Sequence, residues 1–443
     1  MIILGLGSNI GDRFEHLRKA LKLLKNMPAL TVQQISPIYM SDALLPDHAP
    51  ASWDVPYLNL AIRCETTLAP HALLEQIKAI EKKVGRIPEI DWGPRIIDID
   101  ILAWDNLIKY DDKLHIPHEH LHERPFALWP LADVAPFWIY PLPGPLQGKT
   151  AMEIAAQWGP RHQGNAPFHI KQIPHRIDTP ALVGIVNVTP DSFSDGGQFF
   201  DEERAFQQVV DLVDAGAEII DIGAEATGPH AKPIDSEKEW HRLEPLLKKI
   251  VAEREHFLIP PKISIDTRQV ATAKQALSLP VDWINDVSGL DDPAMREMLS
   301  KQSCDIVFMH HLGIPVSQSG LIAFNQDPVS TVYEWAEKRL AELDKAQIDR
   351  SRLIFDIGIG YGKNAEHSLE LIKKAAIFHE LGIRLLVGHS RKSFLTQLTV
   401  KPAAERDLET TVMSLYLAKQ AIDYLRIHNV DSHARALKVN AIF

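Results

Sequence analysis

The sequence of 443 residues has little cysteine, no long apolar run and no excess of positive charge. Its two cysteines, Cys64 and Cys304, lie far apart, which excludes a disulfide framework and a cysteine zinc motif and indicates a reducing compartment. No apolar run approaches the roughly 18 residues of a membrane span, so we expect no membrane partner. Because 58 acidic residues outnumber 47 Lys and Arg, the net charge of −11 disfavours a nucleic-acid partner. No basic or Arg-rich leader follows Met1, so we expect a cytoplasmic protein.

Proline and glycine mark a boundary within the chain. Both are concentrated between positions 141 and 180, where they end regular elements rather than continue them. At roughly 150 residues per domain, the length agrees with two or three domains. We predict a first domain at 1–160, a linker at 161–177 and a second domain at 178–443.

The two domains show different orders of elements. In the first, apolar runs and helical spacing predict strand, helix, strand, strand, helix, strand, with strands at 1–7, 30–40, 57–66 and 96–104. This βαββαβ order is typical of a ferredoxin-like α+β domain. The second repeats strand and helix eight times, with strands predicted at 181–189, 218–224, 262–267, 283–289, 304–310, 352–358, 384–390 and 424–430. Eight such units favour an α/β TIM (β/α)8 barrel, and a doubly wound sheet is the alternative.

The predicted barrel strands end in polar residues, namely Asn187, Asp221, Asp266, Asn285, Asp286, His310, Asp356, Lys392 and His428. Active sites of such barrels lie at the carboxyl ends of the strands. Helix capping explains any one of these residues about as well, but it does not explain the whole set. Together they suit a flat heterocycle with N–H and carbonyl edges. Arg426 and His428 share one face of the eighth strand, where this fold usually binds phosphate.

A second candidate site is the pair Asp98 and Asp100 in an apolar strand. Alternation along a strand points both carboxylates to one face and Ile99 to the other. Two adjacent carboxylates repel unless a cation lies between them, and Mg²⁺ with substrate phosphates is the usual use of such a pair. The alternative is a pair of aspartates at a solvent-facing strand edge.

The segment Trp-Gly-Pro-Arg-Ile-Ile-Asp-Ile-Asp at 92–100 resembles the signature of hydroxymethyl-dihydropterin pyrophosphokinases, as do 5–9, 56–59 and 124–131. The resemblance implies ATP-dependent transfer of a pyrophosphoryl group to the pterin hydroxymethyl oxygen. It implies catalysis by Asp98, Asp100 and Arg95, with Mg²⁺ on the two aspartates. It also implies ATP contacts by Arg86, Arg95, Lys113, His118 and Glu81, and pterin contacts by Tyr57, Asn59, Trp92 and Phe126.

The segment Asn-Val-Thr-Pro-Asp-Ser-Phe-Ser-Asp-Gly-Gly at 187–197 resembles the first signature of dihydropteroate synthases, and 266–268, 358–364 and 390–392 resemble later ones. The resemblance implies condensation of p-aminobenzoate with the pterin pyrophosphate to give dihydropteroate and pyrophosphate. It implies that Asp266 and Lys392 are catalytic and that pterin contacts Asp221, Asp266, Asn285, Asp356 and Lys392. It assigns pyrophosphate to Asn187, Thr227, Arg426 and His428, a Mg²⁺ ligand to Asn187, and p-aminobenzoate to Phe193, Thr227, Pro229, Tyr361 and Ser390.

The second resemblance has departures that leave alternatives open. Gly228 stands where an arginine is usual and Leu312 where a glutamine is usual, and Arg268 or His230 is a hypothetical substitute for the missing cation. We favour a bifunctional folate-biosynthesis enzyme acting on hydroxymethyl-dihydropterin, ATP and p-aminobenzoate. The alternatives are a pyrophosphokinase with a weakened or non-catalytic pterin-binding barrel and a pterin-dependent methyltransferase barrel. A homodimer through the barrel is also left open.

Overall fold

The computed structural model describes residues 1–87, 93–159, 167–173, 175–188, 198–226, 232–315 and 320–441, except for the side chains of 198–201. The chain forms two compact units, Met1–Asp178 and Thr179–Phe443. In the described part of the chain, no helix is long and apolar enough to cross a bilayer.

The first unit is built on an antiparallel sheet. Its central strands are β1 (Ile2–Ser8), β4 (Tyr57–Thr66) and β5 (Asp98–Trp104), with β1 in the middle, and β2 (Leu30–Ile35) pairs with β4. The helices α1 (Arg13–Lys25) and α2 (Pro70–Val84) complete the βαββαβ order. The predicted ferredoxin-like α+β architecture is therefore confirmed.

The prediction of one continuous strand at 30–40 is wrong, because this segment forms two separate strands. After β2 the chain passes Pro37 and continues as β3 (Tyr39–Ser41), since proline lacks the N–H needed to extend a ladder. The opposite edge of β3 pairs with β8 (Lys171–Gln172), which lies in the stretch expected to be a linker.

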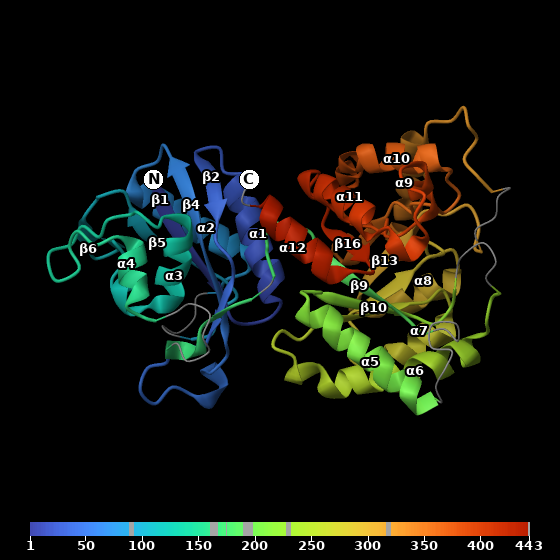
Figure 1. The fold of residues 1–443 in the computed structure, drawn as a ribbon, viewed down its shortest axis with the longest axis horizontal. Helices are drawn as coiled ribbons and strands as arrows, with labels where there is room; N and C mark the ends of the chain where they lie inside the picture. The colour runs from blue at the N-terminus through green and yellow to red at the C-terminus, as the bar shows by residue number, and fades with distance from the viewer. Residues whose placement is uncertain are drawn as a thin grey trace. The chain divides into compact units, whose positions relative to one another are not determined.

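Helices cover both faces of this sheet (Figure 1). The first face carries α1 and α2, and the second carries α3 (Pro125–Val134) and α4 (Ala151–Ala156). Trp129 of α3 is completely buried in the core on the second face. A hairpin of β6 (Lys109–Asp111) and β7 (Leu114–Ile116) and the short 3₁₀ turns η1 (Ala51–Trp53), η2 (Leu121–Glu123) and η3 (Pro167–His169) complete the unit.

The second unit is a closed barrel of eight parallel strands, which confirms the predicted TIM barrel. In chain order the strands are β9 (Ala181–Asn187), β10 (Ile219–Gly223), β11 (Lys262–Asp266), β12 (Trp283–Asp286), β13 (Asp305–Met309), β14 (Leu353–Asp356), β15 (Arg384–Val387) and β16 (Tyr424–Ile427). Each lies within its predicted range but ends earlier. The cause is visible where Asp286 accepts a hydrogen bond from Ser288 N and Asp356 accepts one from Gly358 N, because these contacts turn the backbone out of the strand.

The barrel helices are α5 (Gln198–Asp214), α6 (Ser236–Glu253), α7 (Val270–Ala276), α8 (Pro293–Ser300), α9 (Pro328–Lys345), α10 (Ala365–Lys373), α11 (Asp407–Lys419) and α12 (Val430–Asn440). Short 3₁₀ segments are η5 (Arg254–His256), η6 (Arg350–Arg352), η7 (Ala375–Leu381), η8 (Ser393–Gln397) and η9 (Ala403–Glu405). Inside the barrel, Trp283 and Tyr424 at the starts of their strands pack edge to face, with ring centroids 4.9 Å apart. The barrel is therefore filled near the beginnings of these strands, and its polar residues gather at their ends.

Candidate functional site

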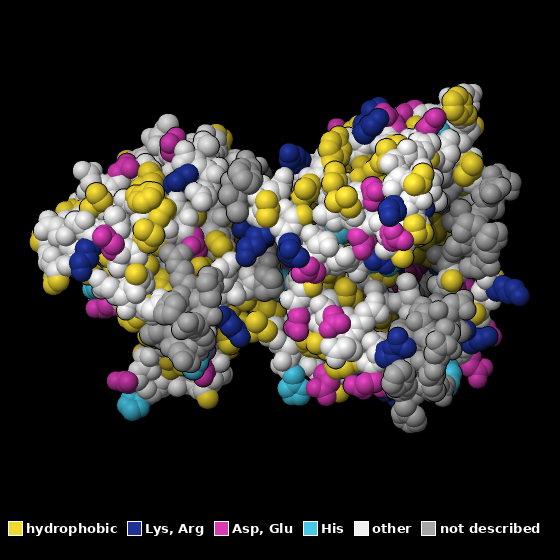
Figure 2. All heavy atoms as spheres, viewed as in Figure 1, with side chains coloured by type: hydrophobic (Ala, Val, Ile, Leu, Met, Phe, Trp, Pro, Cys, Tyr) yellow, Lys and Arg dark blue, Asp and Glu magenta, His cyan; other side chains and the backbone are white. Residues whose placement is uncertain are grey.

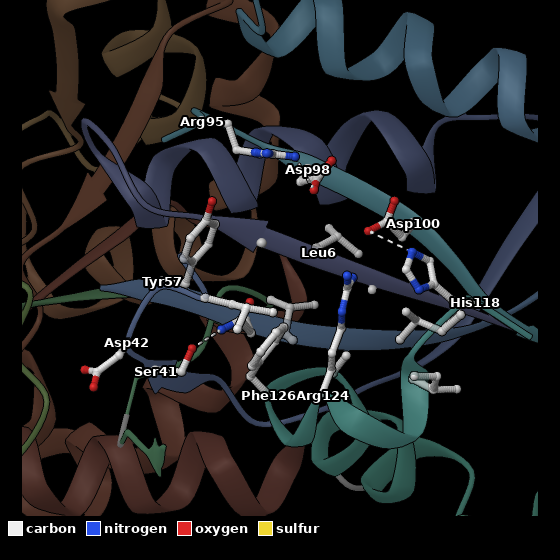
Figure 3. Close-up of a pocket in the computed structure, with 18 of the residues that line it drawn as sticks. Leu6, Ser41, Asp42, Tyr57, Arg95, Asp98, Asp100, His118, Arg124 and Phe126 are labelled. Atoms are coloured by element: carbon white, nitrogen blue, oxygen red, sulfur yellow. Dashed lines mark hydrogen bonds and ion pairs between the residues drawn. The ribbon is translucent and has the colours of Figure 1, made fainter. Parts of the chain in front are cut away.

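A cavity of about 420 Å³ opens on the sheet of the first unit (Figure 3). Its walls come from β1, β4, β5 and the segment around His118 to Ala127. It brings together eight residues predicted for the first site, namely Tyr57, Asn59, Arg86, Arg95, Asp98, Asp100, His118 and Phe126. Figure 3 shows Asp98 and Asp100 side by side on β5, so the expected shared face is present.

The floor of this cavity is open because β1 carries glycine opposite both aspartates. Gly7 pairs in register with Asp98, and Gly5 pairs with Asp100. A Cβ at Gly7 would lie 3.2 Å from Oδ1 of Asn59, so any larger residue would crowd the cavity wall. The Gly-Leu-Gly sequence of β1 thus leaves room for a ligand beside the carboxylates.

The two carboxylates have different electrostatic surroundings. Nη1 of Arg86 lies 2.6 Å from Oδ1 of Asp98, and Nη1 of Arg95 lies 2.9 Å from Oδ2. Burial raises the pKa of Asp98, but the two guanidinium groups outweigh it and the net change is downward. Burial and repulsion from Asp98 instead raise the pKa of Asp100, whose ion-pair contact is Nε2 of His118 at 3.9 Å.

Glu81 of α2 holds the cationic side of the cavity together from behind. Its Oε1 accepts hydrogen bonds from Ile99 N at 2.8 Å and Lys78 Nζ at 2.8 Å, and it lies 2.9 Å from Arg86 Nη1. Burial raises the pKa of Glu81, and the two cations oppose that rise. Glu81 therefore positions Arg86 and β5 and is absent from the cavity lining.

Sequence reasoning missed two cations that line the cavity, Lys78 and Arg124. Lys78 precedes Glu81 by three residues on α2, a spacing that could have shown that the two share a helix face. Lys113 is placed elsewhere, in the turn between β6 and β7, where its backbone N–H donates to Asp111 Oδ1 at 3.1 Å. Its side chain is not part of the cavity lining.

An aromatic and amide wall forms another part of the cavity. Tyr57 and Phe126 both point into it, and Asn59 Nδ2 donates to Ser41 Oγ at 3.0 Å (Figure 3). Burial raises the pKa of Tyr57, so its hydroxyl stays protonated at neutral pH. A flat ring could stack on the aromatic side chains while Asn59 reads its polar edge. The predicted partner Trp92 lies outside the described residues.

The barrel brings a second set of predicted residues together at the ends of its strands. Asp221 is buried on β10 and accepts hydrogen bonds from Ser264 Oγ at 2.5 Å and Asn285 Nδ2 at 3.1 Å. Nε of Arg426 lies 2.6 Å from Asp221 Oδ2, and Nη2 of the same guanidinium lies 2.8 Å from Asp266 Oδ2. Burial raises the pKa of Asp266 even beside this arginine. One cation therefore joins three strands of the barrel.

Asp356, Lys392 and Tyr361 form the neighbouring part of the barrel site. Nζ of Lys392 donates to Ile359 O at 2.5 Å and lies 4.7 Å from the centroid of the Tyr361 ring. Burial lowers the pKa of Lys392 to about 8, although Asp356 opposes the change. Burial raises the pKa of Asp356, and the amine of Lys392 opposes that rise.

The residues predicted to bind pyrophosphate include Asn187 and His428 at the ends of two barrel strands. Ser390 and His428 follow the ends of β15 and β16, and Ser390 Oγ lies 2.9 Å from His428 Nδ1. Burial lowers the pKa of His428 to about 4, so its ring is neutral at pH 7. Asn187 ends β9 and is exposed. The predicted ligands Phe193, Thr227 and Pro229, the departure Gly228 and the hypothetical substitute His230 lie outside the described residues.

The hypothetical substitute cation Arg268 is already paired. Its Nε lies 2.8 Å from Glu225 Oε2, and its Nη2 donates to Glu225 Oε1 at 2.9 Å. A bidentate carboxylate partner uses much of the capacity of a guanidinium to bind an anion. Arg268 would have to leave Glu225 before it could bind pyrophosphate with the same two nitrogens.

Among the described residues, no group of three or more His, Cys, Asp or Glu side chains is arranged to hold a metal ion. Asp98 and Asp100 provide two oxygen donors on one face, and Mg²⁺ commonly completes such a set with water and substrate phosphates.

Comparison with known proteins assigns both units to families. Residues 3–136 match the family described as 7,8-dihydro-6-hydroxymethylpterin-pyrophosphokinase, and residues 183–428 match the family described as pterin binding enzyme. The chain is similar to the Folate synthesis bifunctional protein of Chlamydia muridarum, with 36% identity over 448 residues that cover 99% of this chain and 97% of the relative. The protein of that name in Chlamydia trachomatis is 37% identical, with the same coverage.

Among solved structures, the chain is similar to dihydropteroate synthase from Anaplasma phagocytophilum with bound 6-hydroxymethylpterin-monophosphate. The identity is 36% and the TM-score 0.55, and the match covers 60% of this chain and 99% of that chain. None of these matches supports a methyltransferase or a non-catalytic barrel.

Proposed function

Because the chain belongs to the family of bifunctional folate synthesis proteins, we propose that its two sites act in sequence on one pterin. It is a bifunctional transferase of folate biosynthesis, with a pterin pyrophosphokinase unit that uses ATP and a dihydropteroate synthase barrel. What is proposed here is the role of individual residues. The main support is the cavity in which Asp98 and Asp100 share one face with arginines on one side and aromatic residues on the other.

In the first unit, Asp98 and Asp100 would hold Mg²⁺, and the residues fit such an ion. Two parallel carboxylates repel each other, and the raised pKa of Asp100 reflects that repulsion together with burial. A divalent cation would remove this cost and would neutralise charge on the phosphates of ATP when bound. Arg86, Arg95, His118 and the newly found Lys78 and Arg124 would bind the phosphates, with Glu81 positioning Arg86. Lys113 stays a predicted ATP contact.

The pterin would lie between Tyr57 and Phe126, with Asn59 bound to its polar edge and Trp92 predicted as a further contact. Its hydroxymethyl oxygen attacks the β-phosphorus of ATP, the bond from that phosphorus to the α-phosphate bridging oxygen breaks, and AMP leaves. The hydroxyl proton is released in the same reaction. The protein mainly contributes placement and charge neutralisation.

In the barrel, Asp221, Asp266, Asn285, Asp356 and Lys392 would hold the pterin of the pyrophosphate product. The amine of p-aminobenzoate attacks the methylene carbon, the carbon–oxygen bond to pyrophosphate breaks, and the amine loses a proton. Tyr361 and Ser390, with the predicted contacts Phe193, Thr227 and Pro229, would place the aminobenzoate. Asn187, Thr227 and His428 would bind the leaving pyrophosphate, with Mg²⁺ predicted on Asn187.

Arg426 would couple pterin binding to pyrophosphate binding. Its Nε and Nη2 contact Asp221 and Asp266, and Nη1 is the nitrogen that these two carboxylates leave for a phosphate oxygen. Neutral His428 adds an N–H donor and no charge. The positive charge near the leaving group would therefore come from the metal together with Arg426, whose charge Asp221 and Asp266 partly offset.

The barrel would also form a homodimer through α11. Leu408, Val412 and Tyr416 recur every four residues along this helix with exposed fractions of 73%, 58% and 46%, and Val439 of α12 is 56% exposed. Hydrophobic side chains are visible over α11 in Figure 2. A twofold interface uses the same patch on both subunits, so a second copy is the partner that such a stripe fits. A cytoplasmic location is supported by the two buried, free cysteines, Cys64 and Cys304.

The full chain can test the proposed sequence of reactions. With hydroxymethyl-dihydropterin and ATP, we expect AMP to form, and with p-aminobenzoate added, we expect pyrophosphate and dihydropteroate in equal amounts. Formation of AMP without pyrophosphate release would contradict an active barrel and support a non-catalytic one. Methyl transfer to a third substrate would support the methyltransferase alternative.

A further inference from the structure

Lys363 has no role in the sites described above, yet its side chain is buried at the carboxyl end of the barrel. It follows the glycine-rich loop 358–362 after β14 and is 5% exposed. Its Nζ contacts His310 Nδ1 at 2.7 Å, His310 O at 3.1 Å and Gly358 O at 2.7 Å. An ammonium has three N–H donors, and these three acceptors match them. Burial lowers the pKa of His310 to about 2, so its ring is neutral, and Nδ1 accepts from Lys363 in the tautomer that carries its proton on Nε2.

The contact with Gly358 links Lys363 to a predicted pterin ligand. Gly358 accepts from Lys363 through its carbonyl and donates through its N–H to Asp356 Oδ1 at 2.8 Å. Its φ of +68° and an ideal Cβ only 2.0 Å from His310 O require glycine here. Lys363, Gly358 and Asp356 therefore form one chain of hydrogen bonds that fixes the orientation of the carboxylate.

The same loop holds two more residues of the barrel site. Ile359 O accepts a hydrogen bond from Lys392 Nζ at 2.5 Å, and the Tyr361 ring lies beneath that amine. Tyr361 N in turn donates to Gly358 O at 3.0 Å. A shift of Gly358 would thus move Asp356, Lys392 and Tyr361 together.

We propose that Lys363 is a positioning residue of the synthase reaction, which ties loop 358–362 to the end of β13 and so fixes Asp356 and Lys392 for the pterin. The proposal rests on the proposed function of the barrel. Without the lysine, His310 Nδ1 and His310 O would lose this donor, Gly358 O would keep only Tyr361 N, and the loop would relax. A displacement of about 1 Å at reacting groups can cost roughly a hundredfold in rate.

The test uses the full chain with the Lys363→Met substitution. Binding of 6-hydroxymethylpterin monophosphate, measured by calorimetry, should weaken by about tenfold or more, as expected when buried acceptors lose their hydrogen bonds. Pyrophosphokinase activity of the same polypeptide should stay unchanged. Wild-type affinity in a folded Lys363→Met barrel would overturn the proposal.

A matched pair at His310 keeps the test valid if Lys363→Met fails to fold. The side-chain oxygen of Asn lies close to the place of Nδ1, so His310→Asn keeps an acceptor for Lys363, whereas His310→Leu removes it. We expect pterin affinity near wild type for His310→Asn and several-fold weaker for His310→Leu. Equal affinities of the two variants would overturn the proposal.

A double-mutant cycle with Asp356→Asn separates positioning from a general structural role. If Lys363 acts through Asp356, the double variant should bind pterin little worse than Asp356→Asn alone, whereas independent losses would multiply. Multiplying losses would overturn the proposal. If Asp356→Asn binds normally, the pterin assignment of Asp356 fails and the inference falls with it. If only Lys363→Met binds normally, the inference alone is overturned.

Discussion

The cavity of the first unit and the mouth of the barrel use charge in opposite ways. Four Lys and Arg side chains line the first cavity with three aspartates, and Arg86 and Arg95 come from outside the strand that carries the carboxylates. In the barrel, Arg426 lies between Asp221 and Asp266, and its charge is largely balanced before any ligand arrives. In the first cavity one carboxylate, Asp98, lies between two arginines, an arrangement that favours a polyphosphate, whereas in the barrel one arginine lies between two carboxylates, which provides fixed donors and acceptors for a ring.

The largest effect is expected from substitutions of the paired aspartates, Asp98 and Asp100. Asp98→Asn or Asp100→Asn should lower pyrophosphokinase kcat by at least about a hundredfold, because a metal-stabilised charge worth several kcal/mol is lost. AMP formation measures the effect. Pyrophosphate release from supplied pterin pyrophosphate and p-aminobenzoate is the control and should not change. An Asp100→Asn variant that retains full kinase activity would show that the metal assignment is wrong.

The next effect is expected at Lys392, the amine of the barrel site. Lys392→Ala should reduce synthase kcat/KM by about ten- to a hundredfold, since a hydrogen-bonding charged group near the pterin is removed. Kinase activity should be unaffected. Comparable losses in both activities would mean that the two sites are not independent, and the contrast between them would fail.

Sequence reasoning worked best where the alternation of side chains along a single strand determines which face each residue occupies. Alternation placed Asp98 and Asp100 on one face without any knowledge of the sheet. It could not show that Arg426 contacts both Asp221 and Asp266, because those contacts form only when β16 closes the barrel by pairing with β9, which in turn pairs with β10. Lys78 was missed for a similar reason. Its place in the cavity lining depends on the packing of α2 against β5, where Lys78 Nζ donates to Ile99 O.

The strand ends show another limit of the sequence. The predicted strand 283–289 ends at Asp286, because that carboxylate bonds to Ser288 N and Gly289 then adopts a positive φ of +63°. Some polar groups of the site lie on the last residues of strands, such as Asp266 and Asp356, and others lie beyond the strands, such as Lys392 and His428. Hydrophobic runs therefore locate a barrel strand well and locate its functional end less well.

A smaller effect should appear in the pH dependence of the two reactions. Burial lowers the pKa of Lys392 to about 8, so this amine is charged below that pH and loses its proton above it. Synthase kcat/KM should therefore fall as the pH rises from 7 to 9, by at most about tenfold per unit. In Lys392→Arg this alkaline limb should disappear, because arginine stays charged. Persistence of the limb in that variant would assign it to another group.

The smallest effect on chemistry is expected at the α11 surface. Val412→Arg should weaken self-association while leaving both activities within about twofold, because surface substitutions away from a site have small effects. Sedimentation over a range of concentrations measures the change, and Lys419→Arg on the same helix is a control that keeps the charge. An unchanged mass distribution would contradict dimerisation through this helix.

The position of strand β8 determines where the polypeptide should be cut to obtain an isolated kinase fragment. Lys171 and Gln172 cover the free edge of β3, and farther along Arg176 bonds to Asp178 and accepts from Arg18 through its carbonyl. A fragment cut at 160 would expose an unpaired backbone edge, which invites aggregation. An isolated kinase fragment should therefore run to Asp178, and the short stretch that carries the chain toward the barrel should be kept as part of the kinase.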